Sequence, residues 1–246
     1  MATLETAHRF RLEFFQVRTA ADLEDLLGEV CALVGCSFYA LTHHVDFLGA
    51  PDAGVRLHNY PEDWVHWFDS QRLGIDDPVH RASRRTAAGF VWCDVPKIIQ
   101  LRPADTAVLD RARRHGIGEG LTIPAHVPGD AHGSCSFAWS EGQAPEVRAL
   151  SFAQSISAFA FEAARSLYRG PVAAAPRLTD RQRECLVWAA RGKTDPQISR
   201  ILGIRHGTVV EHMRNARRRY EAPTRARLAV RALFDGALHF GEVGEP

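Results

Sequence analysis

The chain has 246 residues, of which 24% are charged and 46% hydrophobic, and its formal net charge is +1. It holds no apolar run near the roughly 20 residues that a membrane span needs, and its first residues carry charges where a secretory signal would be apolar. Five cysteines, an odd number without Cys-x-x-Cys spacing, argue against a disulfide framework. These features exclude membrane proteins and disulfide-stabilised secreted domains. We expect a cytoplasmic protein long enough for one large domain and one small one.

The charge is divided unevenly along the chain. Residues 171–246 hold 14 Lys and Arg against 8 Asp and Glu, a net charge of +6. Residues 1–170 hold 16 against 21, a net charge of −5. This asymmetry predicts a basic module that meets a polyanion, attached to an acidic module that does not.

The acidic part alternates helical and strand-forming patterns. Thr19 and Asp22 form a capping-box pattern, and apolar residues then recur at helical spacing until Gly35. Strand-forming residues are enriched in four segments, 37–45, 89–95, 120–127 and 133–139, and helical patterns occupy 61–72, 103–115 and 146–168. We predict an α+β fold, an α-β-α sandwich in which helices cover both faces of a central antiparallel sheet.

The last of these helices carries a single apolar stripe, which consists of Leu150, Ala153, Ile156, Phe159, Ala160, Ala163 and Leu167. The stripe fits either a dimer contact or intramolecular core. Beyond it, Gly170, Pro171 and Pro176 suit neither helix nor sheet. We predict a linker at 170–177 that separates a domain at 1–169 from a domain at 178–246.

The basic part is helical throughout. Capping-box pairs at Thr179 and Gln182 and at Thr194 and Gln197 begin two helices, which stop at Gly192 and Gly203. A short turn at 204–207 leads to a helix over 208–220, and a fourth helix runs from about Thr224 to Asp235. Two short helices joined by a turn that contains glycine, the second one basic, predict a four-helix domain with a helix-turn-helix.

The helix over 208–220 has two distinct faces. One holds core positions, namely Val209, Met213, Ala216 and Tyr220, and the other holds Val210, Glu211, Arg214, Arg217 and Arg218. A recognition helix reads bases with its N-terminal turns while its rear passes the phosphates. We therefore expect double-stranded DNA as a partner, with Arg217 and Arg218 at phosphates. A solvated arginine face is the plainer alternative.

Residues 178–220 resemble the DNA-binding domain of LuxR-type transcription regulators. The matching positions are Leu178, Thr179, Glu184, Trp188, Gly192, Lys193, Thr194, Ile198, Leu202, Gly203, Ile204, Thr208, Val209 and His212. The resemblance adds Lys193 and Thr208 to the DNA-binding candidates and implies RNA polymerase as a further partner. Arg205 replaces the family's usual serine cap, and Val210 replaces a lysine and can contact a thymine methyl.

A phosphorylation receiver needs an acidic pair at the end of its first strand, where this chain offers only Asp46, and a later lysine, of which the domain has only Lys97. Residues 30–140 resemble instead the autoinducer-binding domain of quorum-sensing LuxR-type regulators. The matching positions are Tyr60, Trp64, Asp77, Pro78, Trp92, Gly120, Pro124 and Ser136. The resemblance implies that Trp64 donates to the lactone carbonyl of an acyl-homoserine lactone and that Asp77 accepts from its amide. Tyr60 and Trp92 would be apolar walls and Ser136 would supply a hydroxyl. Phe68 stands where the family usually has tyrosine.

Other motifs point to no further chemistry. Residues 116–120, Gly-Ile-Gly-Glu-Gly, follow a helix and precede a strand, the reverse of a dinucleotide loop. Residues 42–46 lack the histidine spacing of metal-dependent hydrolases, and no Gly-x-Ser-x-Gly elbow is present. We predict no enzyme activity, metal or cofactor.

We therefore expect a ligand-responsive transcription regulator that acts in quorum sensing as a homodimer. The signal would be an acyl-homoserine lactone or a related small molecule, which completes the core of the N-terminal domain. Two alternatives stay open. One is a regulator of the same fold whose ligand is of another class or absent, and the other is a lactone-processing enzyme, which would turn its ligand over.

Overall fold

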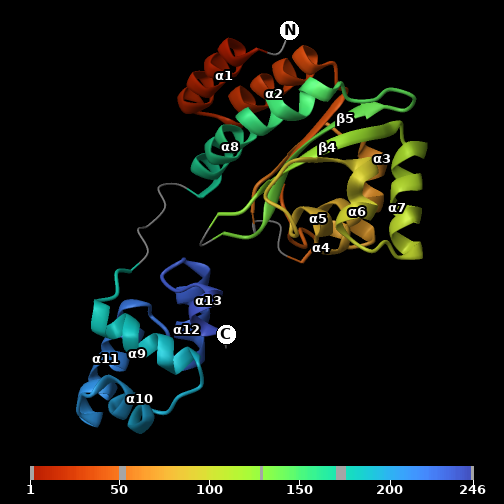
Figure 1. Cartoon of the computed structure of the whole chain (residues 1–246). Coiled ribbons are helices and arrows are strands. Elements are labelled where there is room, and N and C mark those ends of the chain that lie inside the picture. The colour runs from red at the N-terminus through yellow and green to blue at the C-terminus, as the bar shows by residue number, and fades with distance from the viewer. Residues whose placement is uncertain (1–2, 50–53, 128–129, 170–175, 245–246) are drawn as a thin grey trace. The chain divides into compact units, whose positions relative to one another are not determined.

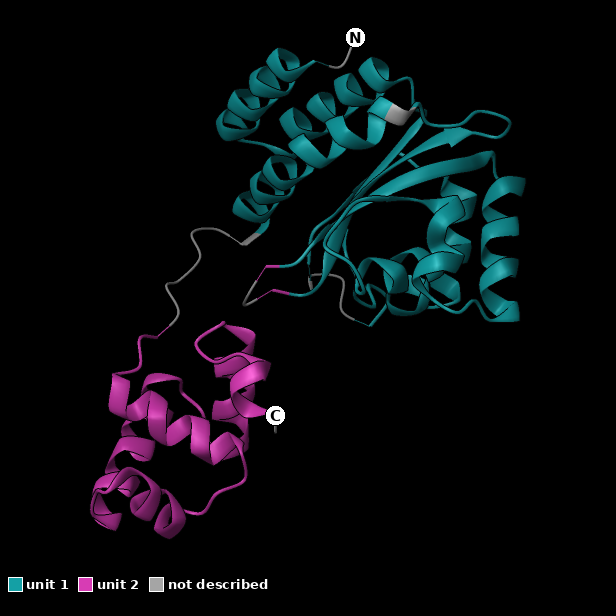
Figure 2. Cartoon of the chain, viewed as in Figure 1, with its two compact units in different colours: residues 1–126, 131–172 teal, residues 127–130, 173–246 magenta. Residues whose placement is uncertain are grey.

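The computed structural model describes residues 3–49, 54–127, 130–169 and 176–244. The chain divides into two compact units, residues 1–126 with 131–172 and residues 127–130 with 173–246 (Figure 2). Most of the predicted linker, residues 170–175, lies outside the described residues. No helix in the described ranges is long and apolar enough to cross a membrane.

The first unit is built on a five-stranded sheet with the strand order β2-β1-β5-β4-β3, in which every neighbouring pair is antiparallel. The strands are β1 (Phe38–His43), β2 (Arg56–His58), β3 (Phe90–Val91), β4 (Ile117–Ala125) and β5 (Gly133–Ser140). The predicted antiparallel sheet is confirmed, and the sequence analysis did not identify the short strand β2.

The strand predicted over 89–95 is wrong beyond Val91. The chain leaves β3 for a 3-10 helix, η1 (Trp92–Asp94), and then for α6 (Val95–Ile98). Pro96 lies in the first turn of α6, where its missing N–H costs nothing, whereas a strand there would lack a ladder donor. The turn removes Trp92 from the strand and directs it back against β4.

Helices cover both faces of the sheet, as the predicted sandwich requires (Figure 1). On one face lie α1 (Leu4–Gln16), α2 (Ala20–Val34) and α8 (Val147–Arg169). On the other lie α3 (Glu62–Ser70), α4 (Leu73–Asp76), α5 (Pro78–Ser83), α6 and α7 (Pro103–Arg114). Because strand residues alternate between faces, Leu41 and Phe137 point to the first group and Ala40 and Ser136 to the second.

The face under α1, α2 and α8 holds the main core. Phe10, Leu23, Leu41, Phe137 and Ile156 are each less than 2% exposed there. The capping box of α2 is confirmed, since the Thr19 hydroxyl accepts the Asp22 N–H and the Asp22 carboxylate accepts the Thr19 N–H. The apolar stripe of α8 belongs to this core, in whole or at its edge.

The second unit contains α9 (Asp180–Ala190), α10 (Asp195–Leu202), α11 (His206–Arg219), α12 (Arg225–Phe234) and a short α13 (Phe240–Val243). Both predicted capping boxes are present, at Thr179 with Gln182 and at Thr194 with Gln197. Gly203 ends α10 in the left-handed conformation, with φ of 64°. The core of the second unit is formed by Cys185, Leu186, Ile198, Val209, Met213, Leu228 and their neighbours.

The turn predicted at 204–207 is shorter than expected. Helix α11 begins at His206, because the Arg205 carbonyl already accepts the N–H groups of Thr208 and Val209. Gly207 therefore lies in the first helical turn. The weak helix propensity of glycine costs less in a first turn than in the interior of a helix.

Candidate functional site

A cavity of about 90 Å³ lies between the sheet and the helices α3 to α7. All six residues that the sequence analysis proposed for ligand binding line it, namely Tyr60, Trp64, Phe68, Asp77, Trp92 and Ser136. They come from α3, the loop before it, the start of α5, η1 and β5. Most of the remaining lining is apolar, with Ala40, Val65, Val79 and Ile117 among it. A small amphipathic molecule suits such a wall with few polar groups.

Helix α3 supplies an aromatic wall. Trp64 and Phe68 are one turn apart and their ring centroids are 5.7 Å from each other. Trp64 is buried, and its ring also lies 5.3 Å from that of Trp67. Phe68 meets the imidazole of His80 edge-on at 5.9 Å. The aromatic rings therefore hold one another in place at the border of the cavity.

Asp77 begins α5. Its carboxylate oxygen Oδ1 accepts hydrogen bonds from the backbone N–H groups of Val79 and His80, each at 2.9 Å. Pro78, in the first turn of α5, needs no such partner. The Asp-Pro pair is thus a helix start as well as a border of the cavity. Sequence reasoning noted the pair but not its capping role.

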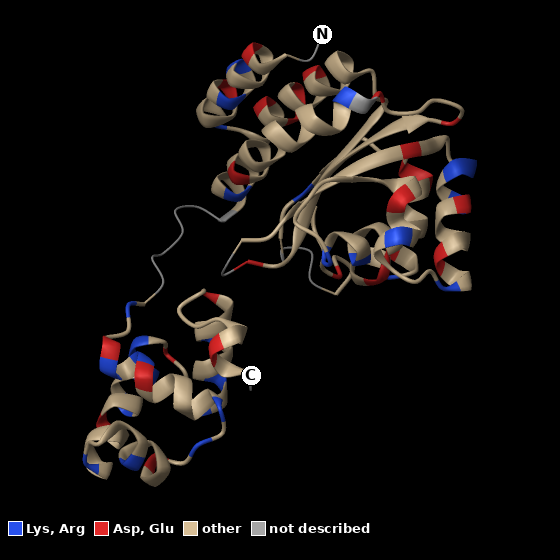
Figure 3. Cartoon of the chain, viewed as in Figure 1, with Lys and Arg blue, Asp and Glu red and all other residues tan. Residues whose placement is uncertain are grey.

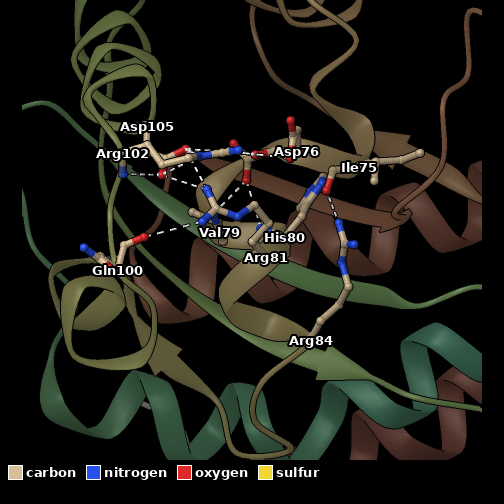
Figure 4. A network of polar contacts seen from close by, with 10 residues as sticks. Ile75, Asp76, Val79, His80, Arg81, Arg84, Gln100, Arg102 and Asp105 are labelled. Carbon is tan, nitrogen blue, oxygen red and sulfur yellow. Dashed lines mark hydrogen bonds and ion pairs between the residues drawn. The ribbon is translucent and has the colours of Figure 1, made fainter.

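Helix α5 is joined to the start of α7 by an ion pair on the buried carboxylate of Asp105 (Figure 4). Arg81 contacts both carboxylate oxygens of Asp105, the nearer at 2.7 Å, and Arg102 contacts Oδ1 at 3.0 Å. Burial acts to raise the pKa of Asp105, but hydrogen bonds from Arg102 and Arg81 lower it to about 2. The sequence analysis missed this brace, which holds Asp77 and His80 against the cavity.

Trp92 is hydrogen-bonded to a pair of hydroxyl groups on the neighbouring strands β4 and β5. The indole N–H of Trp92 donates to the Thr122 hydroxyl at 2.9 Å, and that hydroxyl lies 2.8 Å from the Ser136 hydroxyl. The absence of a side chain at Gly120 leaves room for the indole of Trp92, because a Cβ at this position would lie 2.6 Å from the ring. Since the one N–H of Trp92 is used inside the protein, this side chain presents an apolar surface.

Two stacked imidazoles flank the cavity. The rings of His44 and His80 lie 3.9 Å apart, and His80 Nδ1 is 2.9 Å from the Gly74 carbonyl, to which it donates. Burial lowers the pKa of both residues, so both imidazoles are neutral near neutral pH. Within the part of the chain that the structure describes, no group of three or more His, Cys, Asp and Glu could hold a metal ion.

The seven DNA-binding candidates are all exposed in the second unit, whereas Val209, Met213 and Ala216 of α11 are buried. The predicted division of α11 into a core face and an outer face is therefore confirmed. Figure 3 shows Lys and Arg along this unit. Val210 is 42% exposed at the front of the helix, where a recognition helix meets base edges.

Two of the basic candidates have partners within their own unit. The Arg217 guanidinium donates to the carbonyls of Ala222, at 3.3 Å, and Pro223. Arg214 pairs with Glu211, and the hydrogen bond from Arg214 is the main cause that lowers the pKa of Glu211. The Arg217 side chain thus binds the carbonyls of the loop after α11.

Comparison with known proteins extends these observations to both units. Residues 19–164 match the family described as "Autoinducer binding domain", and residues 176–232 match "Bacterial regulatory proteins, luxR family". The chain is 35% identical over 192 residues to the quorum sensing-dependent transcriptional regulator RpaR of Rhodopseudomonas palustris, which is 77% of each chain. It is 25% identical over 224 residues to the transcriptional activator LuxR of Aliivibrio fischeri, covering 89% of this chain and 88% of that one.

The fold also has solved counterparts. A crystal structure of Escherichia coli SdiA matches 98% of this chain and 99% of its own, with a TM-score of 0.66 and 22% identity. A structure of SdiA in complex with octanoyl-rac-glycerol matches 96% of each chain, with the same TM-score of 0.66 and 22% identity. The named relatives are transcription regulators and not enzymes. The chain therefore belongs to the LuxR family of quorum-sensing transcription regulators, with an autoinducer-binding domain followed by a luxR-type helix-turn-helix domain.

Proposed function

We propose that this regulator binds an acyl-homoserine lactone in the cavity of its first unit and, as a homodimer in the cytoplasm, binds promoter DNA through α11. The observation that carries this proposal is the meeting of six predicted ligand residues around one mostly apolar cavity. The proposed domains are residues 1–169 for ligand binding and dimerisation and 178–246 for DNA binding, joined by a linker at 170–177.

Each cavity residue has a proposed role. Trp64 donates its indole N–H to the lactone carbonyl, and Asp77 accepts the ligand amide N–H beside the two backbone N–H groups that it already binds. Tyr60 and Trp92 form walls. Ser136 offers a hydroxyl, because the Thr122 hydroxyl can serve as its partner on the protein side.

Ligand binding would act by stabilising the folded domain. A ligand that binds only the folded form adds about 2.7 kcal/mol at a hundredfold excess over its dissociation constant. That is a substantial part of the stability of an ordinary domain. The liganded dimer would then persist, present two recognition helices about one turn of DNA apart, and contact RNA polymerase.

Most of the apolar stripe of α8 packs into the core, but its Phe159 is only partly buried. Leu12 and Phe15 of α1 are 47% and 60% exposed, and the ring of Phe15 lies 5.9 Å from Phe159 of α8. Exposed apolar groups that continue onto a second helix form a patch suited to a partner. We propose this α1 and α8 patch as the dimer contact.

A second candidate keeps the fold and changes the ligand. Phe68 removes the hydroxyl usual in the family, and a solved structure holds SdiA in complex with octanoyl-rac-glycerol, which is not a homoserine lactone. Ligand identity is tested by mass spectrometry of the small molecule that co-purifies with the full chain. An acyl-homoserine lactone supports the first candidate, another lipid-like molecule the second, and turnover of added lactone would contradict both.

A further inference from the structure

The cavity face of the sheet carries one row of side chains, which includes four neighbours on β2, β1, β5 and β4 and continues to Phe90 on β3. His58 on β2 is paired with Ala40 on β1, Ala40 with Ser136 on β5, and Ser136 with Thr122 on β4. Because paired residues on neighbouring strands point to the same face, these four side chains lie side by side. Neighbouring strands are about 4.8 Å apart, so His58 lies roughly 10 Å from Ser136, across the methyl group of Ala40.

The two ends of the row differ in how their polar atoms are satisfied. At the inner end, the hydroxyls of Thr122 and Ser136 and the indole N–H of Trp92 bind one another. At the outer end, Nδ1 of His58 is buried and has no hydrogen-bond partner among the described residues, although His58 lines the cavity. A buried polar atom without a partner is costly, and a bound ligand is one way to supply that partner.

The surroundings of His58 define what it can bind. Burial lowers the pKa of His58, and the charge of Arg56 lowers it further, so the imidazole is neutral. Arg56 is itself paired with Asp69 at 2.9 Å and lies over the ring of Phe47. The neighbouring Thr42 hydroxyl donates to the His43 carbonyl. Among the described residues, the charge of Arg56 at this end of the cavity is therefore paired, and Nδ1 of His58 is a polar atom there that still lacks a partner.

We propose that His58 is a specificity residue for the far end of the ligand, and that the natural signal ends in a neutral hydrogen-bonding group such as a hydroxyl. The inference rests on the proposed function, because it assumes an acyl-homoserine lactone whose head lies at Trp64 and Asp77. A neutral imidazole has one donor and one acceptor nitrogen, and a hydroxyl can bind either. A plain alkyl end leaves Nδ1 unpaired.

The test uses matched pairs of homoserine lactones that differ only in a terminal hydroxyl. Butanoyl, hexanoyl, octanoyl and decanoyl compounds and their ω-hydroxy counterparts are titrated into the full chain by calorimetry. At the chain length that reaches His58, we expect the hydroxy compound to bind about fivefold tighter, the effect of one ordinary hydrogen bond. At other lengths the hydroxyl should weaken binding, because it loses water without gaining a partner.

Variants assign the preference to His58. In His58→Leu and His58→Phe the hydroxy compound should bind more weakly than the alkyl compound at every length. His58→Gln, which keeps a donor and an acceptor, should retain the preference. Thr42→Val on the neighbouring strand is the matched control and should also retain it, since that hydroxyl already has a backbone partner. Two different apolar replacements separate the loss of the nitrogen from the loss of packing.

Three results would overturn the proposal. Equal affinity for both members of every pair in the wild type would remove the polar subsite and leave the proposed function intact. If the preference for the hydroxy compound survives in His58→Leu and His58→Phe, His58 is not the residue that causes it, and the proposed function again stays intact. If no homoserine lactone binds the wild type at all, the proposed ligand class is wrong, and this inference fails with it.

Discussion

The Asp77 carboxylate accepts the backbone N–H of His80 at 2.9 Å, and the same oxygen accepts the N–H of Val79. The residue proposed to hold the ligand amide therefore also starts the helix that carries His80 into the cavity. An alanine at this position would remove both functions at once. An asparagine would keep an oxygen for the helix and lose the negative charge.

We expect Asp77→Ala to weaken ligand binding by about 1.5–3 kcal/mol, the value of a hydrogen bond to a charged group. It should also destabilise the unliganded protein by about 0.5–2 kcal/mol through the lost cap. Asp77→Asn should lose affinity while it keeps most of the stability. Calorimetric titration and thermal unfolding measure the two effects separately. Wild-type affinity in Asp77→Ala would remove this residue from the binding site.

Phe68→Tyr reports on the acyl group. For a straight-chain acyl-homoserine lactone, the new hydroxyl should strengthen binding or change it little where Ser136 or a water already serves the acyl carbonyl. For a bulky branched or aromatic acyl group against Phe68, it should weaken binding, and we favour this outcome because Trp67 and Phe68 form an apolar wall. Titration with straight-chain, branched and aryl compounds decides between them. Tighter binding of a straight-chain compound alone would contradict our preference.

Adjacent arginines of α11 should behave differently on substitution. The Arg218 side chain makes no hydrogen bond or ion pair among the described residues, although its charge helps to lower the pKa of Glu211. Arg218→Ala should weaken binding to all DNA sequences and reduce the salt slope by about one. Arg217→Ala should in addition destabilise the second unit by about 1–2 kcal/mol, because the loop carbonyls lose their donor. Binding is measured against salt concentration, and unfolding by circular dichroism. Arg113→Ala in the first unit is the charge control, and an unchanged slope in Arg218→Ala would remove that residue from the interface.

Stability should fall as the pH drops below neutral. Burial holds the pKa of His44 well below its ordinary value of 6.5 and also lowers that of His80. Above 6.5 both groups are neutral whether the chain is folded or unfolded, so they make no difference. Below it the unfolded chain takes up protons that the folded chain does not, so the free energy of unfolding falls by up to about 1.4 kcal/mol per pH unit for each histidine.

Denaturant unfolding between about pH 7 and about pH 5 measures this slope. His44→Gln should flatten it, because glutamine does not titrate. His66→Gln, at an exposed position on α3, is the control and should leave the slope unchanged. A wild-type free energy that is constant over this range would show that these imidazoles are not held neutral.

Phe15→Asp tests the proposed dimer contact. Because Phe15 is 60% exposed, the change should alter protomer stability by no more than about 0.5 kcal/mol, while a buried charge in the interface should shift the protein towards monomer. Sedimentation of the liganded protein measures the shift. Ile75→Asp, at another exposed apolar position of the same unit, is the matched control. A dimer of wild-type strength in Phe15→Asp would place the contact elsewhere.

Features with a local pattern could be predicted from the sequence, and features made by distant residues could not. The capping boxes at Thr179 and Thr194 depend on residues three positions apart, and the structure confirms both predictions. The brace between Arg81 and Asp105 joins residues 24 positions apart on two short helices, and nothing local marks it. Helix α1 was not predicted from the sequence, although the buried residues Phe10 and Phe14 have helical spacing.

The residues that line the cavity also show that contacts between distant parts of the chain could not be predicted from the sequence. The order of Trp64, Asp77 and Trp92 along the chain, through a family resemblance, picked out residues that line one cavity. Thr122 and His80 went unnoticed, because only the register of β4 against β5 and the stacking of the imidazoles bring them there. Arg217 was assigned to phosphate from its face of the helix. Its bonds to Ala222 and Pro223 depend on how the chain folds back after α11.

In the row formed by His58, Ala40, Ser136 and Thr122, the first three residues line the cavity, each from a different strand. Each position in the row is a separate residue on its own strand, so a single mutation can change one of them and leave the others in place. A larger residue in place of Ala40 would shorten the space for the ligand. A substitution of His58 on β2 would change only which chemical group is preferred at the proposed far end of the ligand. A lineage could in this way acquire a new signal by one substitution and keep its DNA-binding domain, so that communication between cells diverges before the genes it controls do.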